Sequence, residues 1–315
     1  MATLKKIEKV KFLGEIHQKE DVSAIAYFED YMLVGSDESQ NIINLLKRED
    51  QDFSLVLDIP LSLDHAEDGE IDIEGMSIDE DGTLYVIGSH SSKRKTIKAS
   101  KTYLANHQRL ATVIAETRKN TIFKLKLDPK TGQVLKRDAN TQLKTVLEKN
   151  IILNRFLNIP SKENGIDIEG LAIYQEKLYL GFRGPVLRGN YVPVMVTEFD
   201  DLLDYELRYV QLDGNGIRDI TRVQDGFLLI AGPVGDGRGA YQLYFWNGED
   251  TIPGEDRPDT SDYCQLIGEI PLPKKYPEAK AEGITVLENK GKKVTAMIVY
   301  DGAPQGAPTL FKLEL

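Results

Sequence analysis

The sequence predicts an all-β protein, a single β-propeller domain over residues 1–315 with five blades of four antiparallel strands. A phrase recurs along the chain, strand-like segments follow each copy of it, and segments at the two ends complement each other. Repeats of roughly forty to sixty residues with four strands each are typical of propellers, because each blade buries its faces against its neighbours.

The recurring phrase is clearest in two copies, "IDIEGMSIDEDGTLYVIGSHS" from Ile71 and "IDIEGLAIYQEKLYLGFRGP" from Ile166. Each copy contains an apolar strand, a polar turn and a second strand that ends near glycine. Weaker copies begin at Asp21, Gly216 and Ala281. Segments rich in β-branched and aromatic residues follow, and we interpret them as the outer strands of each blade.

The last repeat has only three strand-like segments, while "KVKFLGEIH" precedes the first repeat without partners. We therefore expect the N-terminal strand to complete the last blade and close the ring. The irregular stretch "GQVLKRDANTQLKTVLEKNIILNRFLNIP" leaves room for a sixth blade.

One insertion, at about residues 91–120, lacks strand alternation. Its apolar residues Tyr103, Leu104, Leu110, Val113 and Ile114 have a loosely helical spacing, which predicts a helical loop or lid over one rim. Between residues 93 and 119 it contains eight Lys or Arg and a single acid, Glu116. The insertion is thus strongly basic, whereas the rest of the chain is strongly acidic.

The repeated phrase itself suggests what its residues do. Strict alternation in a strand would place Asp72 and Glu74 on one face with Met76, and Gly75 on the other. Glycine at this position suits an innermost strand, where neighbouring blades converge on the axis.

The glutamates are harder to explain by packing. Glu74, Glu169 and Glu282 occupy the same position of three repeats, so we expect them near one mouth of the central channel. Crowded carboxylates need a cation, backbone donors or protons to offset their repulsion. Calcium or magnesium is one solution, since both take oxygen ligands. A ring of salt bridges with Arg183 and Arg218 is the alternative, and it needs no metal.

A second group of polar residues follows the second strand of each repeat. It includes Ser36, Asp37, Ser89, His90, Arg183 and Asp301. Negative charge beside His90 would raise the pKa of its imidazole, which suits a general acid. Ser89 and His90 are adjacent, so they do not form a nucleophile and base pair by themselves, and no G-x-S-x-G phrase supports a serine nucleophile.

Composition restricts the classes of function. The formal net charge of -11 argues against general attraction to nucleic acid or anionic membrane. A single cysteine, Cys264, excludes an intramolecular disulfide framework and multi-cysteine metal sites. The N-terminus has no apolar segment of signal-peptide length, and no apolar run suits a membrane helix, so we expect a cytoplasmic protein.

The phrases "DIEGMSI", "YVIGSHSSKRK", "DIEGLAIY", "LYLGFRGPV" and "GIRDI" resemble the bacterial family called domain of unknown function 3616. More distantly, a D-x-E-G phrase that opens a propeller strand is similar to esterase-like phytases and gluconolactonase-like propellers. In the latter a glutamate before glycine binds a divalent metal, which implies the same role for Glu74, Glu169 or Glu282.

Two hypotheses follow. The first is a metal-assisted hydrolase of an anionic ester, either a phosphate ester or a lactone, with no organic cofactor. Glu74, Glu169 and Glu282 would bind the metal, and His90 or Asp219 would transfer protons. Ser89, Arg183, Arg218, Asp37 and Asp301 would contact the substrate.

The second hypothesis is a non-catalytic propeller whose rim binds a small anionic ligand or an acidic protein. Nucleic acid is a weaker candidate, because Tyr103 is the only aromatic residue of the basic insertion.

Overall fold

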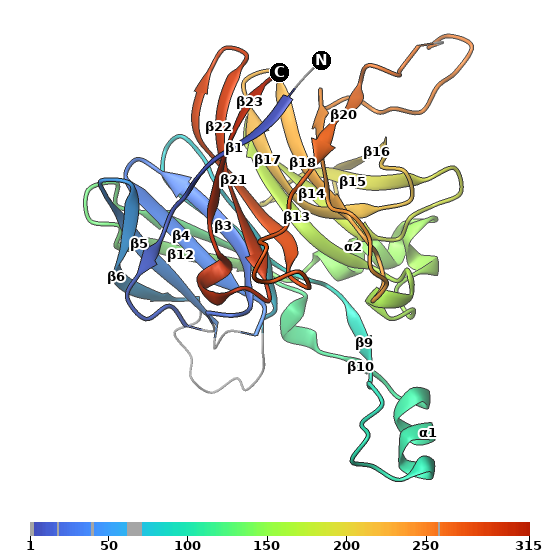
Figure 1. The fold of residues 1–315 in the computed structure, drawn as a ribbon. Helices are drawn as coiled ribbons and strands as arrows, with labels where there is room; N and C mark the ends of the chain where they lie inside the picture. Colours follow the sequence, from blue (N-terminus) through green and yellow to red (C-terminus); the bar gives the residue numbers. More distant parts are fainter. Residues whose placement is uncertain (1–2, 18, 39–40, 62–70, 258) are drawn as a thin grey trace.

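The protein is a five-bladed propeller in the computed structural model, which describes residues 3–17, 19–38, 41–61, 71–257 and 259–315. Five antiparallel sheets surround a central axis, and a hairpin-mounted helix projects from one end (Figure 1). The predicted all-β propeller fold is confirmed.

Each blade is numbered from its innermost strand outward. Blade 1 contains β3 (Val22–Phe28), β4 (Tyr31–Ser36), β5 (Ile42–Glu49) and β6 (Asp52–Pro60), with the short β2 (Phe12–Leu13) along its edge. Blade 2 contains β7 (Ile73–Ile78), β8 (Thr83–Gly88), β11 (Ile122–Leu127) and β12 (Val134–Asn140). Blade 3 contains β13 (Asp167–Tyr174), β14 (Lys177–Gly184), β15 (Tyr191–Glu198) and β16 (Tyr205–Gln211).

The last two blades complete the ring. Blade 4 contains β17 (Gly216–Val223), β18 (Gly226–Gly232), β19 (Gln242–Trp246) and β20 (Cys264–Glu269). Blade 5 contains β21 (Lys280–Lys290), β22 (Lys293–Asp301), β23 (Thr309–Glu314) and β1 (Thr3–Lys9).

The ring closes as the sequence predicts. Strand β1 pairs antiparallel with β23, with Leu4 opposite Leu313 and Lys6 opposite Phe311. The irregular stretch proposed for a sixth blade forms β12 and then helix α2 (Leu143–Lys149), which buries Leu143, Val146 and Leu147. Within the described residues it contributes no further sheet, so the blade number is five.

Glycines on the innermost strands allow neighbouring blades to approach closely. A Cβ added at Gly75 would lie 2.9 Å from the Leu171 Cβ of the next blade. One added at Gly170 would lie 2.8 Å from Ile220 Cγ2 of the blade after that. The predicted packing role of these glycines is confirmed.

The predicted alternation around them is wrong, because every innermost strand contains a β-bulge. In β7 the pairing with β8 skips one residue between Ile73 and Gly75. Ile73 and Met76 both approach Gly35 on the preceding blade, a spacing of three that regular alternation forbids. The extra residue is Glu74, so the bulge separates its side chain from the face that Met76 occupies.

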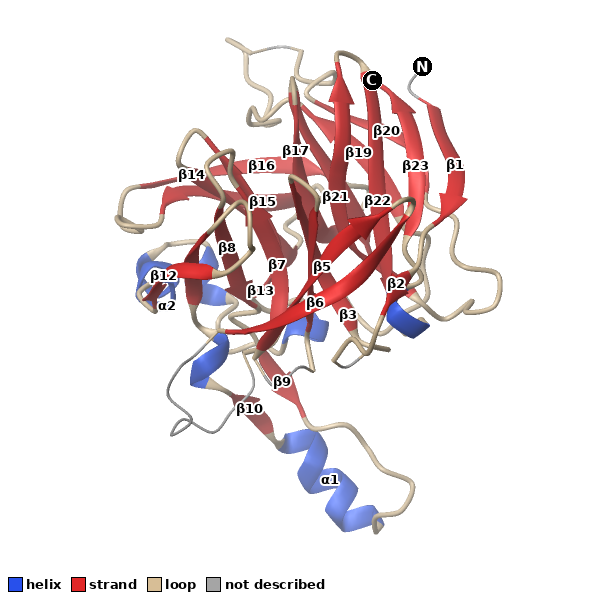
Figure 2. Ribbon diagram, turned by 90° about the vertical axis from the view of Figure 1, so that its left-hand side faces the viewer, coloured by secondary structure: helices blue, strands red, loops and turns tan. Residues whose placement is uncertain are grey.

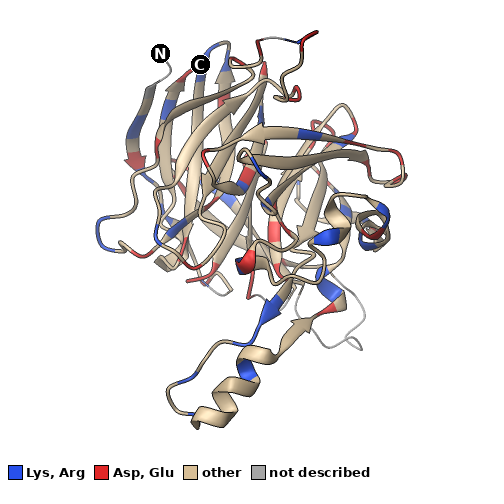
Figure 3. Ribbon diagram, turned by 90° about the vertical axis from the view of Figure 1, so that its right-hand side faces the viewer, with Lys and Arg blue, Asp and Glu red and all other residues tan. Residues whose placement is uncertain are grey.

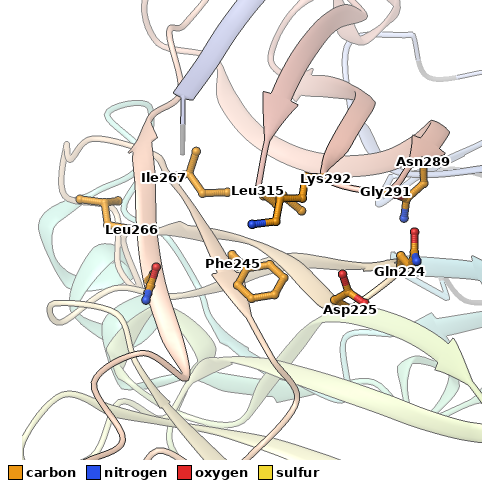
Figure 4. A pocket seen from close by; sticks show the side chains of 10 residues that line it. Gln224, Asp225, Phe245, Leu266, Ile267, Asn289, Gly291, Lys292 and Leu315 are labelled. Carbon is orange, nitrogen blue, oxygen red and sulfur yellow. The ribbon is translucent and has the colours of Figure 1, made fainter. Parts of the chain in front are cut away.

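The two ends of the propeller differ. The innermost strands begin at one end, here called the entry face, and finish at the other, here called the exit face. A cavity of about 900 Å³ opens at the exit face between the ends of all five innermost strands. A smaller apolar hollow of about 450 Å³ lies between blades 4 and 5 on the same side, lined by Phe245, Leu266, Ile267 and Leu315 (Figure 4).

The insertion forms an arm between β8 and β11. It contains the β9 (Ser92–Arg94) and β10 (Val113–Ala115) hairpin, helix α1 (Tyr103–Ala111) and the turn η1 (Thr117–Lys119). Val113 and Ile114 belong to β10 rather than to the predicted helix, because α1 ends at Ala111. The arm projects away from the entry face instead of covering the rim (Figures 1 and 2).

None of the helices in the described ranges is long and apolar enough to cross a membrane.

Candidate ionic site at the channel mouth

The five bulges align at the entry face, and the bulged residues are the polar residues of the repeated phrase. The skipped positions are Ser23, Glu74, Glu169, Arg218 and Glu282. A bulged residue makes no regular ladder bonds, so its side chain is free to turn toward the channel. Neighbouring residues complete a site with both acids and cations, namely Asp37, Asp72, Asp167, Lys119, Arg183, Lys280 and Asp301.

On blades 3 to 5 the acids are paired with cations, and we call this region the paired half. Arg183 binds Asp167 and also Glu169, whose Oε1 lies 2.7 Å from its Nη1. Arg218 binds Glu282, and its Nε lies 2.9 Å from Glu169 Oε2. Both guanidinium groups are almost completely buried. The carboxylates of Asp167 and Glu169 help to hold the pKa of Arg183 above its usual range against the opposing effect of burial.

On blade 5 the paired half continues outward. Lys280 binds Asp301, and its Nζ lies 3.9 Å from Glu282 Oε1. The Lys280 side chain is 45% exposed, which makes it the most accessible cation of the site. An anion entering the mouth would meet this ammonium group before either arginine.

On blades 1 and 2 acids predominate, and Asp37, Asp72, Glu74 and Lys119 form what we call the acid-rich half. Lys119 comes from the base of the arm, and its Nζ lies 2.9 Å from Asp72 Oδ2 and 3.1 Å from Glu116 Oε2. Glu74 has neither a hydrogen bond nor an ion pair with any residue that the structure describes. Among the described residues it is therefore, like Asp37, a carboxylate of the mouth without a cation partner.

The electrostatic cost of this crowding is visible in the pKa values. Burial, together with the charges of Glu169, Asp72 and Asp167, raises the pKa of Glu74 well above its usual range. Burial and the nearby carboxylates of Asp301 and Asp72 raise the pKa of Asp37 to about 8. Burial raises the pKa of Asp167 to about 7, although the Arg183 charge opposes this rise. These acids are therefore poised to take up a proton or a cation.

Two overlapping groups of carboxylates have the geometry to hold a metal ion. One contains Asp37, Asp72 and Glu74, and the other contains Glu74, Asp167 and Glu169, with one oxygen of each residue within 4.8 Å of the others. The buried oxygens Asp37 Oδ1 and Asp167 Oδ1 have no hydrogen-bond partner among the residues that the structure describes. Glu74 belongs to both groups. Of the predicted ligands, Glu74 and Glu169 therefore come together, while Glu282 lies beyond Arg218.

Asp219 has a different environment from the other acids. It occupies the glycine position of its repeat, and its Oδ2 accepts a hydrogen bond of 2.7 Å from the Ile284 N–H of blade 5. Its Oδ1 accepts another from the N–H of Ile220. Burial raises its pKa well above the usual range even though backbone donors lower it. This carboxylate links two blades and lies outside both carboxylate groups.

Ser89 and His90 follow β8 as predicted, but the expected pKa of His90 is wrong. Burial lowers the pKa of His90 to about 4, because the imidazole is enclosed and no carboxylate contacts it. Its Nδ1 lies 2.8 Å from Gly88 O, so Nδ1 carries the proton and Nε2 is an unprotonated acceptor. Ser89 Oγ donates to Asp72 and does not contact the His90 ring.

Sequence reasoning missed four members of the site, Asp72, Asp167, Lys119 and Lys280. The first two precede each "IEG" phrase, and Lys280 occupies the equivalent position before Ala281 and Glu282, so the repeat alignment contains the signal for three of them. Lys119 has no such signal, because it ends an insertion that the other blades lack.

The fold and the mouth together define a five-bladed propeller with an ionic site where its innermost strands begin. The chain belongs to the family described as protein of unknown function DUF3616, which matches residues 21–307. The family resemblance seen in the repeated phrases is thereby confirmed. No curated protein matched the chain.

Several solved structures are similar in part. They include the Dos1 propeller (12% identity, TM-score 0.38, 94% of this chain and 60% of that one) and Kuenenia stuttgartiensis hydrazine synthase (10%, 0.41, 90% and 57%). An exo-β-1,3-galactanase from Phanerochaete chrysosporium has 9% identity and a TM-score of 0.44, over 98% of this chain and 64% of that one. The chain spans about three fifths of the length of these solved chains.

Proposed function

We propose that the acid-rich half binds a divalent cation, calcium or magnesium, and that the protein uses it to hydrolyse an anionic ester. The observation that carries this proposal is Glu74, a carboxylate without a cation partner in the described chain, shared by two groups of acidic oxygens. A hard divalent cation takes several such oxygens and offsets their repulsion. The unpartnered oxygens of Asp37 and Asp167 fit the same ligand.

The ligand set differs from the one proposed from sequence. Asp37, Asp72 and Glu74 of the acid-rich half would hold the cation, and Asp167 and Glu169 of the paired half form the second group that shares Glu74. Glu282 binds Arg218 instead, so we do not include it. A bound cation would polarise the ester and lower the pKa of a water molecule.

The residues of this chain would serve the reaction as follows. Lys280 would attract the anionic group, because it is the exposed cation at the mouth, whereas Arg183 and Arg218 are buried against carboxylates. Water would add to the carbon or phosphorus atom of the ester, the bond to the leaving oxygen would break, and the proton lost by water would be accepted by a base. We assign this role to His90, because its imidazole is neutral with Nε2 unprotonated, although its low pKa of about 4 makes it a weak base.

A second candidate function is a binding scaffold without catalysis. One observation favours it: Arg218 on blade 4 binds Glu169 on blade 3 and Glu282 on blade 5, so three blades are tied together by one guanidinium. In this case the paired half is structural, and the mouth binds a small anionic ligand or an acidic protein. The likeness of the D-x-E-G phrase to phytases and gluconolactonase-like propellers stays a prediction.

Thermal melting with and without chelator tests the cation. We expect calcium or magnesium to stabilise the chelated protein, by about 2.7 kcal/mol at a hundredfold excess over Kd. Glu74→Gln should abolish the shift, while Glu176→Gln, an exposed acid on the exit face, should retain it. An unchanged wild-type midpoint with either metal would contradict the proposed site.

A screen of generic phosphate esters and lactones tests the chemistry separately. If the protein is a hydrolase, a metal-dependent rate should be present in wild type and Glu176→Gln and absent in Glu74→Gln. Metal binding without any turnover would favour the scaffold over the enzyme.

A further inference from the structure

The arm, residues 91–120, presents an apolar helix face to solvent. On α1 the exposed residues are Tyr103, Leu104, His107, Gln108, Leu110 and Ala111, whereas Ala105, Asn106 and Arg109 are half-buried. Helix α1 has no buried residue at all. An ordinary surface helix does the reverse and turns its apolar stripe toward the protein.

The arm nevertheless has a fixed internal structure. Asn106 exchanges two hydrogen bonds with the backbone of Lys98, both of 3.1 Å. Arg109 donates to Thr96 O, and the Thr102 side chain caps the helix at the Ala105 N–H. The polar side chains of α1 are thus used inside the arm, and its apolar side chains are left outward. A preformed apolar face of this kind is typical of a contact surface.

The charge of the arm indicates the chemistry of its partner. Its cations include Lys93, Lys95, Lys98 and Lys101, and Figure 3 shows Lys and Arg along its length. Glu116 is its single acid, and it pairs with Lys93 and Lys119 at the base. The surface that binds the arm should therefore carry acidic residues that pair with the lysines beside the apolar face.

The same molecule carries such a surface on the same face. Glu20, Asp21 and Glu38 on blade 1 form what we call the acidic sector; Glu20 and Glu38 are exposed, and Asp21 is half-buried. Gly302 N–H donates to Glu20 O, and Asp37 N–H donates to Asp21 O, so these segments lie side by side. Asp301, which lies beside the sector on blade 5, is buried and paired with Lys280. The arm emerges from blade 2, so it does not cover the sector of its own chain.

We propose that two copies of this chain associate entry face to entry face, each placing its arm on the acidic sector of the other. Because arm and sector lie on one face of each copy, a two-fold axis lets both contacts form at once and closes the assembly. Direct contact between the two arms is disfavoured, since both are basic. The proposal does not depend on the cation or on hydrolysis.

Molecular mass in solution, measured by light scattering and sedimentation over a range of concentrations, tests this proposal. We expect wild type to form a dimer that weakens with salt. Leu104→Ser combined with Leu110→Ser should raise the dissociation constant by about tenfold or more. Both side chains are exposed, so the melting temperature of the monomer should not change.

Charge reversal gives a second and more specific test. Lys98→Glu with Lys101→Glu should abolish the dimer, and adding Glu20→Lys with Glu38→Lys to that chain should restore it. Lys292→Glu on the exit face is the matched control and should dimerise like wild type.

Two results would overturn the proposal. One is a wild-type protein that stays monomeric at every concentration, with or without binding to anionic phospholipid vesicles in a flotation assay. The other is a dimer that persists in both arm variants.

Discussion

The two halves of the channel mouth are built from the same repeated phrase but differ in whether their carboxylates have cation partners. In the paired half, Arg218 replaces the glutamate of one repeat, and Arg183 bulges in from a second strand. In the acid-rich half the corresponding positions carry Ser23 and Glu74, and one lysine from the arm is the neighbouring cation. The residue at the bulge therefore affects whether the carboxylates at a blade end have a cation partner.

The difference between the two halves indicates which buried carboxylates stabilise the fold and which do not. Buried ion pairs repay their desolvation only with good geometry and further hydrogen bonds. Arg218 meets this condition by contacting two blades at once. Glu74 does not, so its stability depends on something other than the described residues, either a proton or a cation.

The largest expected effect comes from breaking the paired half. Arg218→Met would leave Glu169 and Glu282 buried without this cation, and we expect a loss of about 3–5 kcal/mol in the free energy of unfolding. Denaturant unfolding at neutral pH measures it. Arg238→Met is the control, because that arginine pairs with Glu278 on the surface and should change stability by less than about 1 kcal/mol. Equal losses in the two variants would refute the contrast between buried and exposed pairs.

A smaller effect of opposite sign is expected in the acid-rich half. Glu74→Gln removes an uncompensated carboxylate, so in chelator it should raise the free energy of unfolding by about 1 kcal/mol. The gain should vanish when saturating calcium stabilises the wild type. Thermal melting of both proteins, each with chelator and with calcium, gives the four values needed. A destabilised Glu74→Gln in chelator would show that the carboxylate is already compensated.

The acid-rich half also predicts a dependence of stability on pH. Asp37 has a folded-state pKa of about 8, above its unfolded value of about 4, so the folded state binds more protons between these limits. Its contribution to stability is therefore fully present below about pH 4 and is lost as the pH rises toward 8. Compared with Asp37→Asn, wild type in chelator should lose stability as the pH rises from 5.5 toward 8, with a slope that approaches the limit of about 1.4 kcal/mol per pH unit for one group. Parallel stability curves from pH 5.5 to 8.5 would contradict this.

Much of the fold was predictable from the sequence because repeats report architecture directly. The phrase in five copies predicted five blades, and the unpaired ends predicted that β1 would join β23. The glycines at positions 75 and 170 predicted close packing for a reason that depends only on backbone approach.

The site was predictable only in part. Alternation treats a strand as regular, so it cannot show the bulges that turn Glu74 and Arg218 toward the channel. The environment of His90 was also hidden, because sequence proximity to acids does not reveal burial, and burial reversed the expected pKa. Lys119 reaches Asp72 through an insertion, and no periodic pattern describes such a contact.

The closure of blade 5 has a consequence for how this protein folds. Thr3 pairs with Glu314, so β1 can join blade 5 and close the ring only after β23 is available for pairing. Because the two strands are so far apart in sequence, this contact has the largest entropic cost of loop closure in the chain. Proteins whose contacts are mostly between distant residues fold slowly. Until β1 pairs with β23, the edge of β23 is unpaired and can form hydrogen bonds with another chain. By covering the edge of β23, strand β1 therefore limits aggregation as well as completing blade 5.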